Sequence, residues 1–230
     1  MTDPVEVQTI AARIAAISQQ LPPQTRLIAI TKTVAAPLIR QAYAAGVRDF
    51  GESRIQELES KCQVLADLND IRWHFIGHLQ RNKAKRAVEL CDWIHSVDSL
   101  ALAKRLNQVV ADVPQAPKLC LQVKFVEDPN KYGWSVGDLK ADLPELLQYK
   151  KLDIQGLMTI LPLGLSETQI LTTFKQTCSL AKQLTAETNG ALQLRDLSMG
   201  MSSDYQWAVQ AGATMVRVGR TLFGERRIPT

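Results

Sequence analysis

Two segments near the end of the chain indicate most about its fold: Leu197-Ser198-Met199-Gly200-Met201-Ser202-Ser203-Asp204 and Met215-Val216-Arg217-Val218-Gly219-Arg220. Each begins as an apolar strand and ends in small residues. A helix is expected after the first segment, with Ser202 or Ser203 as its N-cap. Such a turn offers backbone N–H groups and the positive end of a helix dipole, which favour a bound anion. An ordinary tight turn has the same composition, so the strands that precede these turns have to be counted.

Eight strands are predicted along the chain, and a helix follows each of the first seven. The strands are expected at residues 26–32, 47–51, 71–77, 93–97, 118–123, 154–158, 194–198 and 215–218. Strict alternation of strands and helices favours a parallel sheet. Eight such units in 230 residues are typical of a closed (β/α)8 barrel, the TIM barrel. An open doubly wound sheet stays an alternative if the count is wrong by one.

The whole chain, residues 1–230, is expected to form one α/β domain. A helix that starts near Asp3 and ends at Pro22-Pro23 precedes the first strand, so the barrel carries an extra N-terminal helix. No linker, repeat or low-complexity segment divides the sequence. The sequence ends a few residues after the eighth strand, at Thr230, and no second domain is expected.

The composition indicates a cytoplasmic protein that binds neither nucleic acid nor a membrane. A net charge of +4 is mild for this length. The four cysteines contain no CxxC pair, which suits reduced thiols. Asp3 and Glu6 stand where a signal peptide would be basic. No apolar run approaches the roughly 18 residues that a membrane-spanning helix needs.

The barrel interpretation gives the two terminal turns a role. In TIM barrels the active site lies at the carboxyl ends of the strands, and the loops after strands 7 and 8 often hold a phosphate. Arg217 and Arg220 add positive charge there. Lys32 ends the first strand, which neighbours the eighth strand in a closed barrel. An amine where solvent is partly excluded can attack an aldehyde or ketone, although a solvated surface lysine is the alternative.

An amine beside a phosphate site fits two kinds of chemistry. One is a Schiff-base aldolase that acts on a phosphorylated sugar. The other is a site for pyridoxal 5′-phosphate (PLP), in which the lysine forms an imine with the aldehyde of the cofactor. The residues considered so far leave both open.

Six segments resemble the pyridoxal phosphate homeostasis proteins, a family related to the barrel domain of bacterial alanine racemase. They are Ala29-Ile30-Thr31-Lys32-Thr33, Phe50-Gly51-Glu52-Ser53-Arg54-Ile55-Gln56-Glu57, Trp73-His74-Phe75-Ile76-Gly77-His78-Leu79-Gln80-Arg81-Asn82-Lys83, Gly156-Leu157-Met158, Leu197 to Asp204 and Val216-Arg217-Val218-Gly219. They are spread over nearly the whole chain, and the third and fifth are highly specific.

The resemblance implies a fold-type III PLP protein that binds PLP as a Schiff base on Lys32. It implies that Arg217 faces the pyridine nitrogen. The other cofactor-binding residues that it implies are Met158, Ser198, Gly200, Met201, Ser202, Gly219 and Arg220, most of them around the phosphate. Ser53 departs from the family pattern, which usually has Asn there, so a contact near the cofactor is expected to be absent or reshaped.

The expected function is PLP binding with little or no catalytic turnover, in intracellular vitamin B6 homeostasis and amino-acid and keto-acid balance. A guanidinium is a donor only, so a pyridine nitrogen opposite Arg217 stays unprotonated and the ring is a weak electron sink. Racemisation needs a base on each face of the substrate carbon, and the second domain that supplies one in alanine racemase is expected to be missing. A PLP-dependent amino-acid racemase of narrow scope is the alternative.

Expected partners are PLP and PLP-dependent apo-enzymes as recipients, and the chain is expected to be a monomer or weak dimer.

Three other features have competing interpretations. His74 and His78 are four residues apart, but they lack the companion ligands of a metal motif, so no metal site is expected. His78 would lie at the cofactor rim or form a structural hydrogen bond. The basic run Arg81-Asn82-Lys83-Ala84-Lys85-Arg86 is expected to be a solvated helix face rather than a nucleic-acid patch. Lys131 is expected to be a surface lysine, with receipt of PLP during transfer as the alternative.

Overall fold

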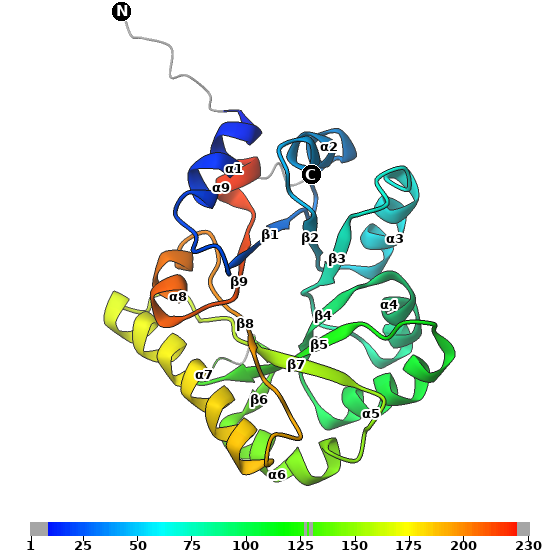
Figure 1. Ribbon diagram of the computed structural model, residues 1–230, viewed down its shortest axis with the longest axis vertical. Helices are drawn as coiled ribbons and strands as arrows, with labels where there is room; N and C mark the ends of the chain where they lie inside the picture. Colours follow the sequence, from blue (N-terminus) through cyan, green and yellow to red (C-terminus); the bar gives the residue numbers. More distant parts are fainter. Residues whose placement is uncertain (1–8, 127, 129–130, 225–230) are drawn as a thin grey trace, which may run out of the picture.

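Parallel strands close into a barrel in the computed structural model, which describes residues 9–126, 128 and 131–224 (Figure 1). The barrel strands are β1 (Arg26–Ile30), β2 (Asp49–Glu52), β3 (Arg72–Phe75), β4 (Trp93–Val97), β5 (Lys118–Lys124), β7 (Asp153–Met158), β8 (Asp196–Ser198) and β9 (Met215–Val218). They follow one another around the barrel in chain order, and β9 pairs with β1 to close it. The predicted (β/α)8 barrel is thus confirmed over the open sheet. A further two-residue strand, β6 (Trp134–Ser135), pairs with β5 outside this ring.

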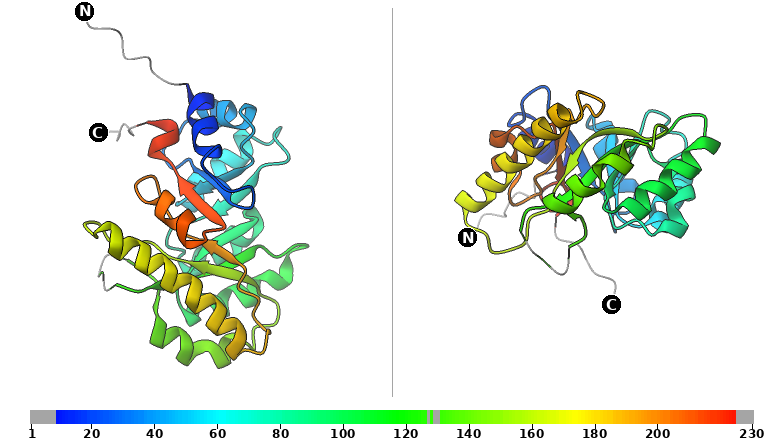
Figure 2. Two further views of the ribbon diagram at one scale, coloured as in Figure 1. Left: turned by 60° about the vertical axis from the view of Figure 1, so that its left-hand side comes forward. Right: turned by 90° about the horizontal axis from the view of Figure 1, so that it is seen from below.

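Helices surround the barrel on its outside, as Figures 1 and 2 show from three directions. They are α1 (Ile10–Ser18), α2 (Ala36–Ala44), α3 (Ile55–Val64), α4 (Ala84–Leu90), α5 (Leu100–Val109), α6 (Val136–Leu146), α7 (Glu167–Glu187), α8 (Tyr205–Ala211) and α9 (Arg220–Phe223), with 3-10 turns η1 (Arg81–Lys83) and η2 (Val110–Asp112) beside α4 and α5. The extra N-terminal helix α1 packs against α2 and α9. The expected helix start at Asp3 lies outside the described residues.

Serine side chains begin several of the helices. Ser99, Ser135 and Ser166 each accept a hydrogen bond from a backbone N–H in the first turn of the helix that follows. At Ser166 the side chain of Gln169 bonds back to the N-cap backbone, which completes a capping box. These caps satisfy N–H groups that the helix itself leaves without partners, and they end the loops that lead from strand to helix.

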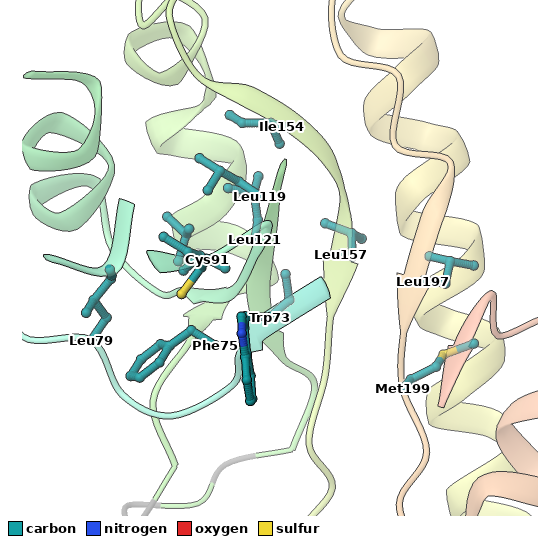
Figure 3. Packing of buried hydrophobic residues seen from close by; sticks show 14 of the residues in the cluster. Trp73, Phe75, Leu79, Cys91, Leu119, Leu121, Ile154, Leu157, Leu197 and Met199 are labelled. Carbon is teal, nitrogen blue, oxygen red and sulfur yellow. The ribbon is translucent and has the colours of Figure 1, made fainter. Parts of the chain in front are cut away.

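Apolar side chains fill two separate layers because successive strand residues point to opposite faces. The larger layer lies between the strands and the helices and includes Leu119, Leu121, Leu157 and Leu197 (Figure 3). The smaller layer lies inside the barrel and consists of Ile28, Ile30, Trp93, Cys120, Met158 and Met215. The remaining inward positions of several strands are polar, and these residues form the floor of the site described next.

Candidate functional site

A cavity of about 500 Å³ lies at the carboxyl ends of the barrel strands. Because all the strands are parallel, their following loops meet at this one face. The walls are formed by Ile30, Lys32, Ser53, Ile76, Gly77, His78, Gln122, Lys131, Tyr132, Ile160, Leu163, Met201, Ser202, Ser203, Arg217, Gly219 and Arg220. Residues from both ends of the chain therefore contribute to one site.

The cavity wall is cationic on part of its surface and apolar on the rest. Lys32, Lys131, Arg217 and Arg220 line it, and none of the described lining residues is an aspartate or glutamate. A concave site with charge of one sign concentrates ligands of the opposite sign. Isoleucine, leucine and methionine side chains cover much of the remaining wall. The arrangement suits an anion that carries an apolar, ring-sized body.

Lys32 lies two residues past the end of β1, and a group of polar residues on α3 and β2 holds the backbone on both sides of it. The Nζ of Lys61 donates to the Thr31 carbonyl at 2.6 Å, and Glu57 Oε1 accepts from the Thr33 N–H at 2.5 Å. Thr33 has a positive φ of 63°, which is uncommon for a β-branched residue. The local backbone conformation that presents Lys32 is thus fixed by hydrogen bonds from another element.

Glu52 and Lys61 form the centre of this group. Glu52 Oε1 accepts from Lys61 Nζ at 2.7 Å and from Thr31 Oγ1 at 2.5 Å. The Glu52 side chain is fully buried, and its Oε2 has no hydrogen-bond partner among the described residues. Burial raises the pKa of Glu52, although Lys61 opposes the change. The sequence interpretation did not find Lys61, because a lysine within a polar helix gives no sign of burial.

The loops after β8 and β9 are joined by one hydrogen bond: the Gly219 N–H donates to Ser202 Oγ at 3.2 Å. The expected N-cap at Ser202 or Ser203 is wrong, because α8 begins at Tyr205 with Asp204 as its N-cap residue. The Asp204 carboxylate accepts from the Met201 N–H. Two backbone N–H groups of these loops are therefore already bonded within the protein, and the Ser202 hydroxyl keeps its own proton for a further acceptor.

Gly200 makes the tight turn after β8 possible. Its φ is 88°, a conformation that side chains disfavour. A Cβ at this position would also lie 2.5 Å from Ala208 Cβ and 2.9 Å from Tyr205 Cα. Only glycine lets the loop pass this close to α8.

Arg217 is buried at the bottom of the cavity, with 3% of its surface exposed. Its Nη1 donates to Ser198 Oγ at 2.7 Å and its Nη2 donates to the Thr159 carbonyl at 2.8 Å. Burial lowers the pKa of Arg217 to about 10, so the guanidinium is charged at neutral pH. Two protein acceptors thus fix the plane of a buried cation that faces the site.

Behind Arg217, polar side chains cross the interior of the barrel. Ser198 Oγ lies 2.8 Å from His95 Nδ1, His95 Nε2 lies 2.9 Å from His74 Nδ1, and His74 Nε2 lies 2.9 Å from Asp49 Oδ1. Ser198 on β8 and His95 on β4 are not on neighbouring strands, so their contact spans the lumen. The sequence interpretation did not single out His95 or Asp49, because their partners are distant along the chain.

His78 lies at the rim of the cavity. Its ring stacks on Tyr132 with a centroid distance of 3.6 Å and an angle of 11°, and its Nδ1 lies 2.8 Å from Asp98 Oδ2. His78 thus lines the cavity and also makes the structural hydrogen bond that was one of its two interpretations, and its place beside a cofactor stays a prediction. Lys131 is only partly exposed and lines the same cavity.

The nine predicted cofactor-binding residues occupy two depths. Lys32, Met201, Ser202, Arg217, Gly219 and Arg220 line the cavity, as does Ser53. Three others lie behind the wall: Ser198 contacts Arg217, Gly200 packs against α8, and Met158 lies in the apolar layer inside the barrel. The spacing of residues along a strand end does not reveal this difference in depth.

Features outside the cavity concern metal binding, membrane insertion, the basic run and the cysteines. Within residues 9–126, 128 and 131–224, no group of three or more histidine, cysteine or acidic side chains could hold a metal ion. No described helix is both long enough and apolar enough to cross a membrane. In the basic run, Arg86 pairs with Glu59 and Glu89, as expected of a solvated helix face. All four cysteines are free thiols.

The amino-acid sequence is similar to a known protein family and to named members of it. The model of the alanine racemase N-terminal domain family matches residues 5–227. The chain is 51% identical to the pyridoxal phosphate homeostasis protein of Synechocystis sp. over 90% of this chain and 94% of that one. It is 40% identical to the protein of the same name from Pseudomonas aeruginosa over 96% and 94% of the two chains.

Solved structures give the same grouping. PipY of Synechococcus elongatus with PLP bound is 50% identical and superposes with a TM-score of 0.90 over 94% of this chain and 100% of that chain. The barrel of alanine racemase from Clostridium difficile has a TM-score of 0.76 at 13% identity, which covers 97% of this chain but 58% of the racemase. This second likeness concerns the fold alone.

Proposed function

Because the chain belongs to the pyridoxal phosphate homeostasis proteins, within the alanine racemase N-terminal domain family, we propose that it binds PLP in the cavity described above. Its role is to hold PLP and release it to other proteins, and so to maintain intracellular vitamin B6 and the balance of amino acids and keto acids. PipY, which is 50% identical and has been solved with PLP bound, supports this assignment.

The residues present fit this cofactor. PLP carries a phosphate dianion and an aldehyde, and when bound it supplies an electrophilic carbon that reacts reversibly with primary amines. The observation that carries the proposal is that Lys32, the joined loops at Ser202 and Gly219, and the cation Arg217 all line one cavity of about 500 Å³. The cationic and apolar parts of the wall match the phosphate and the ring of PLP.

Each residue has a distinct part in the proposal. Lys32 Nζ forms a Schiff base with the aldehyde carbon of PLP, with loss of water. Met201, Ser202, Gly219 and Arg220 surround the phosphate, with the Ser202 hydroxyl and the Arg220 guanidinium as its donors. Ser198, Gly200 and Met158 support the site from behind the wall rather than by lining it. Arg217 faces the pyridine nitrogen.

Low turnover follows from the charge of Arg217. A guanidinium donates hydrogen bonds but does not give up its proton at neutral pH, so the pyridine nitrogen opposite it stays unprotonated. The bound ring is then a weak electron sink, and carbanion chemistry is disfavoured. We therefore propose a carrier that acts as one barrel domain over residues 1–230, as a monomer or weak dimer. The free thiols support a cytoplasmic location, and PLP-dependent apo-enzymes are the proposed recipients.

Borohydride reduction with peptide mapping tests the proposal. The purified protein loaded with PLP is expected to show a visible absorbance band and, after reduction, one pyridoxyl adduct on Lys32. The Lys32→Ala variant should lose the adduct, whereas Lys131→Ala, a change at another lysine of the same cavity, should keep it. An adduct on a different lysine, or no bound PLP in the wild type, would overturn the proposal.

One observation favours amino-acid racemisation as a second candidate. His78, which bonds to the buried Asp98, places an imidazole on the cavity wall and could move a proton. Exchange of the α-hydrogen of amino acids in deuterated water distinguishes the two candidates. The carrier proposal expects no exchange above that of free PLP, and exchange that disappears in His78→Gln would favour the racemase.

A further inference from the structure

We propose that Arg217, Ser198, His95, His74 and Asp49 form one directed hydrogen-bond chain, in which both histidines are neutral and carry their proton on Nε2. The chain makes His95, His74 and Asp49 positioning residues for Arg217. The contacts are those across the barrel lumen, each 2.7 to 2.9 Å long. The direction of the chain follows from its two ends, considered separately.

The Asp49 end requires donors that point toward it. Arg72 donates to Asp49 from Nε and Nη2 at 2.9 and 2.6 Å, so Asp49 is an ionised carboxylate, which only accepts. His74 Nε2 must therefore carry a proton. In a neutral imidazole the other nitrogen, Nδ1, is then an acceptor, and its partner His95 Nε2 must be the donor.

The Arg217 end gives the same direction independently. A guanidinium only donates, so Ser198 Oγ accepts from Arg217 Nη1. The single hydroxyl proton of Ser198 is left for its other partner, His95 Nδ1, which then accepts. A neutral His95 with an accepting Nδ1 carries its proton on Nε2. Both ends thus assign the same tautomer to His95, and the chain needs no additional proton.

A reversed chain exists only if one proton is added. His74 would then be an imidazolium that donates to both Asp49 and His95, and His95 would donate from Nδ1 to Ser198. That state places a third cation near Arg217 and Arg26 in a site with no exposure to water. Ser198 would also accept twice and have no partner for its own proton. The neutral, directed chain avoids both costs.

The charged groups around the two histidines agree with this assignment. The groups that act on them are Asp49 on β2, Asp92 just before β4, Arg26 on β1 and Arg217 on β9. Both rings are fully buried, and His74 stacks on Trp93. Burial lowers the pKa of His74 and holds the pKa of His95 well below its usual range, with the cations Arg217 and Arg26 adding to the effect at His95.

The effect of this hydrogen-bond chain on ligand binding rests on the proposed function, in which PLP occupies the cavity beside Arg217. Arg217 is held by Ser198 Oγ and the Thr159 carbonyl, and the orientation of the Ser198 hydroxyl depends on His95. Asp49 lies at the other end of the hydrogen-bond chain and carries a negative charge. Its charge polarises the successive hydrogen bonds, and these lead to the buried guanidinium of Arg217. Loss of the middle of the chain should therefore weaken a ligand that Arg217 contacts.

Nitrogen NMR of the protein without PLP tests the chain itself. The sequence contains only three histidines, His74, His78 and His95, so labelling of histidine with ¹⁵N and a His78→Gln variant assign the buried pair. Both buried rings are expected to show a protonated Nε2 and an unprotonated Nδ1 from about pH 6 to 8, where an unperturbed histidine titrates. An imidazolium at either residue, or a proton on His95 Nδ1, would overturn the proposal whether or not any variant folds.

PLP affinity tests the positioning role. His95→Leu is expected to raise the PLP dissociation constant by about tenfold, because Ser198 and His74 each lose a partner. His95→Gln, which can still donate and accept, should stay within about threefold of the wild type. Equal affinity in all three proteins would overturn the role, and equal losses in both variants would also do so. If the wild type binds no PLP, the proposed function fails while the NMR result still decides the direction of the chain.

Discussion

The Nζ of Lys61 lies 2.6 Å from the carbonyl oxygen of Thr31, so a buried lysine on α3 holds the peptide that immediately precedes Lys32. The same Nζ pairs with Glu57, which accepts the N–H of Thr33 on the other side of Lys32. The candidate reactive amine is therefore presented by a segment that another lysine holds in place. A substitution at Lys61 removes this support and leaves the candidate reactive residue, Lys32, unchanged.

Lys61→Met is expected to lower the free energy of unfolding by about 3 kcal/mol, because it leaves the buried Glu52 without its ion-pair partner. Urea denaturation at pH 7 measures the change. The control is Lys140→Met, whose ion pair with Glu187 is partly exposed and should contribute less than about 1 kcal/mol. Similar losses in the two variants would contradict a supporting role for Lys61.

Asp49 should make stability depend on pH in the acid range. Burial alone would raise its pKa, but hydrogen bonds from Arg72 and His74 lower the pKa of Asp49 to about 2 from 3.8. The folded state then binds fewer protons than the unfolded state, so this contribution is present above pH 3.8 and is lost as the pH falls through about 2. It amounts to about 2 kcal/mol.

Asp49→Asn removes that contribution. The stability gap between wild type and variant should narrow by about 2 kcal/mol between pH 5 and pH 2, measured as the midpoint of urea unfolding at several pH values. Asp67→Asn is the control, because the ion pair of Asp67 with Arg40 lies on the surface and should change little at any pH. A gap that stays constant with pH would mean that Asp49 is not ionised as described.

Gly200→Ala should be strongly destabilising. The φ of 88° disfavours a side chain, and the added Cβ would collide with Ala208. A loss of about 3 kcal/mol is expected, from the backbone strain and the overpacking together. Gly164→Ala has a similar φ of 85° but nothing within 4 Å of the new Cβ, so it should show only the strain, about 1 kcal/mol. Thermal unfolding of the two variants compares these contributions.

Ser202→Ala removes the acceptor that joins the loops after β8 and β9. The Gly219 N–H loses its partner, and PLP binding should weaken by roughly tenfold. Ser203→Ala changes the neighbouring serine, which lines the cavity but is exposed, and should weaken binding by less than about threefold. Titration of the visible absorbance with PLP measures both. A larger effect at Ser203 would mean that the loop junction is not part of the phosphate site.

The predictable part of the fold depended on patterns that are local in sequence. Apolar runs ended by glycine, proline or capping residues located the barrel strands within a few residues, and the end of β1 placed Lys32 on the cavity wall. The N-cap of α8 was misplaced because Ser202, Ser203 and Asp204 are all good caps. The path of the loop decides the outcome: Asp204 takes the N-cap position without a side-chain cap bond, because its carboxylate accepts from Met201, and Ser202 Oγ accepts from Gly219.

The sequence by itself determined the number and order of the barrel strands and of the helices between them, and with them the face of the barrel on which the site lies. Only the tertiary structure decided which polar side chains meet inside it. Closure of the barrel brings His95 within 2.8 Å of Ser198, although 103 positions separate them in the chain. Periodicity shows that alternate residues point inward, but it does not show which inward residues face one another. That depends on the stagger and tilt of the strands, which are properties of the closed ring rather than of any one segment.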